Sequence, residues 1–243
     1  ANPILFRVEG LAKKNALEPL GFDLHEGEII GFFGLEGSGL NTVSRMIYGL
    51  EGKDSGDVYF KGEKLNKVSP QDLIVNKILY LNNNRKQAGL LLDSGTADNM
   101  ILPRMDKLSR FTFLRNGLIA DYTEKYINLF SIVIPSIFQR PRNLSGGNQQ
   151  KVIIAKWLCQ KSKLLIFDEP TRGIDVGAKV EVYDLMTRLA EKGVAIIMIS
   201  SELPEILAMS DRIVVMHEGR ITGELQCGEA SQEKIMAYAT GGQ

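Results

Sequence analysis

Two neighbouring stretches of the chain decide its fold: Leu144-Ser145-Gly146-Gly147-Asn148-Gln149-Gln150 and Leu164-Leu165-Ile166-Phe167-Asp168-Glu169-Pro170. In the second stretch, the apolar run 163–167 predicts a buried strand that ends at two carboxylates, Asp168 and Glu169. Open parallel sheets place their ligands at the carboxyl ends of strands. In the first stretch, Ser145 can cap a helix, and the glycines let the backbone approach a phosphate at the helix N-terminus. Together the two stretches predict a phosphate-binding site on a sheet.

The flanking sequence extends this sheet. A helix is predicted at 178–191, because apolar residues recur there at spacings of three and four, and a second buried strand follows at 194–200. This alternation of strands and helices indicates a mostly parallel sheet. The other predicted elements are strands at 29–33, 78–81 and 212–216, an antiparallel strand at 56–62, and helices at 41–49, 122–130 and 231–240.

A glycine-rich loop follows the predicted strand 29–33 and reads Gly34-Leu35-Glu36-Gly37-Ser38-Gly39-Leu40-Asn41-Thr42. Its glycines stand where a phosphate-binding P-loop bends and turns backbone N–H groups toward a phosphate. The strict pattern fails, because Leu40 replaces the lysine that reaches the outer phosphates and Asn41 replaces the hydroxyl residue that holds magnesium. Losing one charged hydrogen bond of about 1.5 to 3 kcal/mol weakens binding about tenfold to a hundredfold. Arg45, one helical turn on, is predicted to point to solvent or to a neighbouring subunit rather than to replace the lysine.

These features predict an α/β fold with a P-loop NTPase (RecA-like) core, a parallel sheet and a small antiparallel β layer. Between 83 and 142 strand-like runs are few and prolines recur, which indicates an inserted helical subdomain. We therefore expect the core to comprise residues 1–82 and 148–243, and the helical subdomain to comprise residues 83–147.

The bulk composition excludes several classes of protein. Lys plus Arg and Asp plus Glu both total 29, so no overall field attracts nucleic acid. Cys159 and Cys227 show no paired spacing, which indicates buried packing positions in a reducing compartment rather than a metal or redox site. The beginning of the sequence lacks the pattern of a signal peptide, and no stretch reaches the roughly 18 apolar residues of a membrane-spanning helix.

Residues 144–150 resemble the signature of ABC nucleotide-binding domains, and residues 164–169 resemble their Walker B strand. The resemblance implies that Asp168 organises Mg²⁺ through water and that Glu169 polarises the attacking water as general base. It implies that Asp175 belongs to the D-loop, which crosses between two paired domains. Ser201 stands where the family carries a switch histidine, and Asn83 stands where a glutamine or glutamate senses magnesium and the permease.

Three further stretches look like the second cassette of tandem ATPases in sugar importers of the ribose and galactose type: Asn148-Gln149-Gln150-Lys151, Thr171-Arg172-Gly173-Ile174-Asp175-Val176-Gly177-Ala178 and Ser200-Ser201-Glu202. This resemblance implies a C-terminal half whose partner cassette lies on the same polypeptide. It also implies integral-membrane permease subunits, a solute-binding protein, and a position on the cytoplasmic face of the inner membrane. The chain departs from that family at Leu40, Asn41 and Asn83.

We therefore expect a cassette that couples ATP to the uptake of a small solute, such as a sugar. Its signature is expected to complete the partner's site, while its own site holds ATP and Mg²⁺ weakly or not at all. The residues expected at nucleotide are Gly34, Glu36, Gly37, Ser38, Gly39, Leu40, Asn41, Thr42, Asn83, Ser145, Gly146, Gly147, Asn148, Gln149 and Asp175, with Asp168 and Asn41 at the metal and Glu169 and Ser201 at the reacting phosphate.

Two alternatives stay open at this point. The first is a fully active ATPase, in which the backbone loop and another cation replace the missing lysine. The second is a nucleotide-gated ABC clamp outside transport, which would be expected to carry long coiled-coil insertions or basic extensions.

Overall fold

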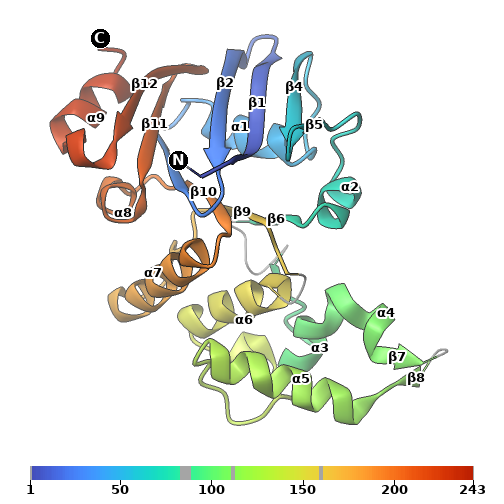
Figure 1. Cartoon of the computed structure of the whole chain (residues 1–243). Helices are drawn as coiled ribbons and strands as arrows, with labels where there is room; N and C mark the ends of the chain where they lie inside the picture. Colours follow the sequence, from blue (N-terminus) through green and yellow to red (C-terminus); the bar gives the residue numbers. More distant parts are fainter. Residues whose placement is uncertain (1, 83–88, 111–112, 159–160, 243) are drawn as a thin grey trace. The chain divides into compact units, whose positions relative to one another are not determined.

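The computed structural model describes residues 2–82, 89–110, 113–158 and 161–242 (Figure 1). It divides into two compact units. Unit 1 comprises Ala1–Tyr80, Lys163–Glu169 and Met186–Gln243, and unit 2 comprises Leu81–Ser162 and Pro170–Leu185.

Unit 1 is built on a six-stranded sheet with the strand order β12-β11-β3-β10-β9-β6 (Figure 1). Its strands are β3 (Ile29–Gly34), β6 (Ile78–Leu81), β9 (Leu164–Asp168), β10 (Ala195–Ile199), β11 (Arg212–His217) and β12 (Arg220–Gln226). Strand β3 pairs in parallel with β10 and β11, and β10 pairs in parallel with β9. The five strands that the sequence predicts in this sheet are confirmed, with ends that differ by no more than one residue.

The predicted β layer is a four-stranded sheet in the order β2-β1-β4-β5. It contains β1 (Ile4–Lys13), β2 (Leu17–His25), β4 (Ser55–Phe60) and β5 (Glu63–Lys64), and its pairings are antiparallel. Of these strands, the sequence pattern identified only β4. Strand β1 was not predicted because its apolar residues do not alternate regularly. The register of its pairing with β2 shifts between Val8 and Leu11 and again between Leu11 and Lys13, and such irregularities interrupt the alternation.

Two helices of unit 1, α1 (Leu40–Ile47) and α9 (Gln232–Ala239), were predicted from the sequence, and their ends differ from the predicted ones by no more than two residues. Helix α1 follows the glycine-rich loop, and α9 packs on β11 and β12 (Figure 1). The side chain of Ser231 caps α9 by accepting a hydrogen bond from the N–H of Lys234. Unit 1 also contains α2 (Pro70–Val75), α8 (Leu203–Met209) and the short η4 turn (Cys227–Glu229).

Unit 2 is helical. Its elements are α3 (Thr96–Ile101), η2 (Leu102–Arg104), α4 (Met105–Leu108), the β7–β8 hairpin (Ser109–Arg110 and Phe113–Leu114), α5 (Asn116–Leu129), η3 (Pro141–Asn143) and α6 (Gly146–Leu158). Helix α7 (Val176–Glu191) has its first ten residues in unit 2 and the others in unit 1. A small apolar core consists of Ala97, Ile101, Leu108 and Ile119.

The limits of unit 2 differ from the helical subdomain expected at 83–147. Helix α6 packs against α3 and α5, so the whole of α6 belongs to unit 2 rather than to the core. Residues 170–185 also belong to unit 2. The sequence pattern could not reveal this grouping, because it depends on which helices share a core.

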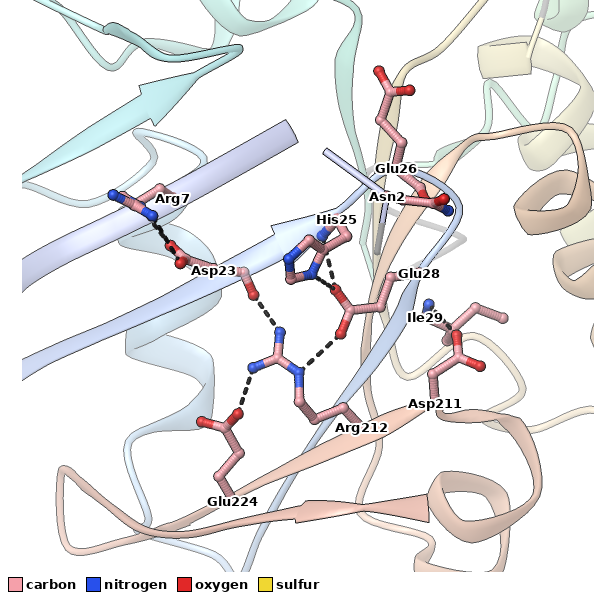
Figure 2. Close-up of polar contacts among 10 residues, drawn as sticks. All are labelled: Asn2, Arg7, Asp23, His25, Glu26, Glu28, Ile29, Asp211, Arg212 and Glu224. Atoms are coloured by element: carbon pink, nitrogen blue, oxygen red, sulfur yellow. Dashed lines mark hydrogen bonds and ion pairs between the residues drawn. The ribbon is translucent and has the colours of Figure 1, made fainter. Parts of the chain in front are cut away.

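A cluster of charged side chains joins the two sheets of unit 1 (Figure 2). Arg212 of β11 donates from Nε to Glu28 over 2.8 Å, from a terminal nitrogen to Glu224 of β12 over 2.5 Å, and from the other to the carbonyl of Asp23 on β2. Burial by itself raises the pKa of Glu28, but hydrogen bonds from Arg212 and from the N–H of His25 outweigh it and lower that pKa.

The lowered pKa of Glu28 predicts how stability depends on pH. A carboxylate whose pKa is depressed on folding stabilises the fold above its unfolded pKa, here 4.5, and loses that contribution as pH falls through the folded value. We therefore expect the difference in unfolding free energy between wild type and Glu28→Gln to shrink as pH falls below about 4.5. Urea titrations from pH 7 to pH 3 measure it, and a difference that stays constant across this range would contradict the assignment.

The structure also bears on membrane-spanning helices and on the two cysteines. Among the described residues, no helix is both long and apolar enough to span a membrane. The expectation that Cys227 is buried is wrong: it is an exposed free thiol, because it begins the η4 turn at the surface after β12. Cys159 lies outside the described residues.

Candidate nucleotide site

The glycine-rich loop joins β3 to α1 in unit 1. Gly37 and Gly39 have φ angles of 85° and 94°, in the left-handed region that favours glycine. At Gly34, a Cβ atom would lie 2.5 Å from Ser38 Oγ and 2.8 Å from the carbonyl oxygen of Met216, so no larger residue fits. The loop therefore has the backbone conformation that its glycines predict.

The backbone N–H groups of this loop are available to a ligand. Ser38 donates to the carbonyl of Leu35 over 3.0 Å and closes the first turn. Within the described part of the chain, the N–H groups of Gly37, Gly39 and Leu40 have no hydrogen-bond acceptor. Because Gly37 and Gly39 are left-handed and lead into the N-terminus of α1, the loop has the backbone pattern of a nest, which suits an anion.

The side chains of the loop, unlike its backbone N–H groups, provide no positive charge for an anion. Leu40 is 9% exposed and packs into the main apolar core of unit 1, while the side chains of Asn41 and Glu36 are exposed. No positive charge stands at the position where a P-loop lysine would be, and Glu36 adds a negative charge. A phosphate in this nest would therefore gain backbone hydrogen bonds without charge neutralisation.

Arg45 does not replace the missing lysine. Its side chain is 48% exposed, and its Nε lies 3.3 Å from a carboxylate oxygen of Glu51, which also pairs with Lys13. The half-exposed side chain of Arg45 is what we expect of a residue that points to solvent or to a neighbouring subunit.

Asp168 ends strand β9 and is 4% exposed. It accepts a hydrogen bond of 2.5 Å from the hydroxyl of Tyr80, which lies in the neighbouring strand β6. Burial, followed by the negative charge of Asp168, raises the pKa of Tyr80 well above its usual value, so this hydroxyl remains a donor. Tyr80 stacks on Tyr48 with ring centroids 5.2 Å apart, and burial raises the pKa of Tyr48 to about 12.

Sequence reasoning missed Tyr80. The only available signal was a hydroxyl at the third position of a strand that is otherwise aliphatic, Ile78-Leu79-Tyr80-Leu81. A buried tyrosine hydroxyl usually finds a hydrogen-bond partner, but the strand itself does not say which one.

Glu169 and Ser201, both expected at the reacting phosphate, are hydrogen-bonded to each other in unit 1. Glu169 adopts a left-handed backbone conformation with φ 52°, and its N–H donates to the carbonyl of Ile199 over 2.8 Å. The Glu169 carboxylate accepts the backbone N–H of Ser201, also over 2.8 Å. The contact uses the backbone of Ser201, so the serine side chain that stands at the switch position takes no part in it.

The signature residues lie in unit 2, at the start of α6. Ser145 Oγ accepts hydrogen bonds from the backbone N–H of Asn148 over 3.3 Å and from its side-chain amide over 3.1 Å. The side-chain oxygen of Asn148 accepts the N–H of Val133. Gln149 is 6% exposed and donates to the carbonyls of Pro141 and Leu144, so it braces the turn from inside.

Asp175 also lies in unit 2, where its Oδ1 accepts the N–H of Ala178 over 2.9 Å and caps α7. Asn83 lies outside the described residues. Among the residues that are described, no group of three or more His, Cys, Asp or Glu side chains could hold a metal ion. A single buried carboxylate, Asp168, suits a magnesium ion held mainly by water and phosphate oxygens.

The sequence model of the ABC transporter family matches residues 17–172, a span that includes the glycine-rich loop, the signature and Asp168. The chain belongs to the ABC transporter family. Its P-loop NTPase fold is confirmed by two similar solved structures, each 20% identical. One is an ATP-binding cassette bound to ADP and Pi, with a TM-score of 0.76 over 92% of this chain and 99% of that one. The other is a cassette in its ADP conformation, with a TM-score of 0.79 over 98% and 95%.

Curated relatives of this ABC cassette include sugar-import ATP-binding proteins. The xylose import protein of Thermoanaerobacter pseudethanolicus is 50% identical over 230 residues, which cover 94% of this chain and 46% of that protein. The ribose import protein of Bacillus subtilis is 45% identical over 238 residues, which cover 98% and 48%. The chain thus spans about half the length of the curated relatives that it matches.

Proposed function

We propose that this chain is the second nucleotide-binding cassette of a sugar importer, with a degenerate site of its own and a signature that completes the site of a partner cassette. The observation that carries the proposal is the contrast between two parts of the chain. Leu40 is packed in the core where a phosphate-binding lysine would be, whereas the signature turn of Ser145 and Asn148 is complete and braced.

The partners follow from the relatives. Because those proteins are about twice as long, we propose that the partner cassette occupies the other half of the same polypeptide. Permease subunits in the inner membrane would carry the sugar, a solute-binding protein would deliver it, and the cassette would act from the cytoplasmic face.

Electrostatics supports a weak site in this chain. Glu36, Asp168 and Glu169 all lie in unit 1, on the loop or at the end of β9, and no lysine stands in the loop to offset them. Hydrolysis needs positive charge against the transferring phosphoryl group more than binding does. Mg²⁺ would supply such charge when bound, and Asp168 and Asn41 are the residues that would orient it. We therefore propose that ATP binds weakly at this site and is cleaved rarely.

Leu40→Lys tests directly whether the missing lysine weakens ATP binding at this site. A lysine there would regain a charged hydrogen bond to phosphate, so we expect MgATP affinity to rise about tenfold to a hundredfold in calorimetric titrations. Leu40→Met is the matched control, since it keeps the buried volume without adding charge and should bind as wild type does. Unchanged binding by a folded Leu40→Lys protein would place the lesion elsewhere. Low-micromolar binding by wild type, with turnover of about 1 per second, would favour the fully active ATPase instead.

A further inference from the structure

The first turn of α6 touches the first turn of α7 at one point in unit 2. A Cβ atom built on Gly147 would lie 2.4 Å from the Cβ of Ala178 and 3.6 Å from its Cα. Real Cβ atoms do not approach one another so closely, and here the neighbour is the short side chain of alanine, which cannot turn away. The second glycine of the signature is therefore required by helix packing inside this chain, independently of any phosphate.

A second contact joins the same two helices one turn further along. Lys151 lies four residues after Gly147, and Glu181 lies three residues after Ala178, so each pair shares one helix face. The ammonium of Lys151 lies 2.5 Å from the Glu181 carboxylate and donates to the carbonyl of Ser131 over 3.0 Å. Since the lysine side chain is only 5% exposed, this ion pair is largely shielded from solvent on one side.

Both helices are tied to the residues proposed to act at the nucleotide sites. Directly before α7, Asp175 Oδ1 accepts the N–H of Ala178, the residue that Gly147 touches. On α6, the side-chain amide of Asn148 donates to Ser145 Oγ. A continuous path of packed atoms and hydrogen bonds thus runs from Ser145 through α6 and α7 to Asp175.

We infer that Gly147 and Lys151 are positioning residues that lock the signature serine and the D-loop aspartate into one rigid piece. This inference rests on the proposed function, in which Ser145 serves the partner's site and Asp175 crosses between the two cassettes. Under that function, a displacement of Asp175 at the interface moves the signature with it, so this chain reports the state of one nucleotide site to the other.

The test uses the pair Gly147→Ala and Ala178→Gly, singly and combined. In Gly147→Ala the added methyl group pushes α7 away, and we expect the backbone amides of 176–180 to exchange with solvent roughly tenfold faster. Ala178→Gly removes the clashing methyl group, so the double variant should return to exchange within about threefold of wild type. Gly177→Ala is the matched control, because a Cβ there meets only Asp175 Oδ1 at 3.4 Å.

Transport by the complete importer, measured beside hydrogen exchange, tells a failure of this inference apart from a failure of the proposed function. If Gly147 acts through α7, Ala178→Gly restores the transport that Gly147→Ala loses. Lost transport together with normal exchange in the double variant would overturn the inference, because Gly147 would then act at the phosphate. If Gly147→Ala does not fold, Lys151→Met gives an independent measurement, and exchange at 176–180 equal to wild type would contradict the second contact. The exchange experiments contain no nucleotide, so they stand even if the proposed function fails.

Discussion

Replacing Ser145 by arginine is expected to abolish sugar uptake by the complete importer, the largest functional effect that we predict. Ser145 is exposed, and its hydroxyl accepts two hydrogen bonds from Asn148. Arginine removes this cap and fills the space in which a γ-phosphate on the partner cassette would approach. Losing the cap costs about 1 kcal/mol, so the fold should survive while the composite site does not form.

The informative comparison is with Glu169→Gln in the same protein. If the site on this chain is degenerate, removing its candidate general base should leave uptake within a few fold of wild type, whereas Ser145→Arg leaves none. Ser145→Ala is the matched control, because it removes the hydroxyl without adding bulk and should give an intermediate loss. Uptake by vesicles containing the complete importer measures all three. Equal, severe losses in Ser145→Arg and Glu169→Gln would show that both sites hydrolyse ATP. That result would contradict the proposal that the site on this chain is degenerate.

Arg212→Met is expected to have the largest effect on stability. The change leaves Glu28 buried without its cation and frees the carbonyl of Asp23 at the junction of the two sheets (Figure 2). Breaking a buried, hydrogen-bonded ion pair from one side costs about 3 kcal/mol or more, because the remaining charge stays desolvated. Urea denaturation of the purified chain measures the loss.

Two controls sharpen this prediction. Arg7→Met removes an arginine from the β layer, but more than a third of each side chain of its pair with Asp23 is exposed, so the urea midpoint should move far less. Combining Arg212→Met with Glu28→Gln should cost less than the sum of the two single changes, since no uncompensated charge remains. A loss under about 1 kcal/mol for Arg212→Met would mean that apolar packing, rather than this cluster, holds the sheets together.

Several features could be predicted from the sequence because their causes are local. Each parallel strand is a short apolar run, and α7 and α9 follow from helical spacing and capping residues. The departure from the P-loop pattern at Leu40 and Asn41 is equally local, because the replacement of a lysine is visible in the residue identity itself. The structure adds that the side chain of Leu40 packs in the apolar core of unit 1.

Other features were decided only by the tertiary structure. Tyr80 reaches Asp168 across 88 positions of sequence, Arg212 reaches Glu28 across 184, and Gly147 meets Ala178 only because α6 and α7 pack in one unit. No periodicity or spacing records such pairs, since each partner alone satisfies many possible contacts and the choice is made when sheets and helices pack. The sequence alone thus pointed to the family of the cassette and to the residues at which its glycine-rich loop departs from the P-loop pattern. The packing decided how Asp168 is held, how the two sheets are joined, and which residues connect α6 to α7.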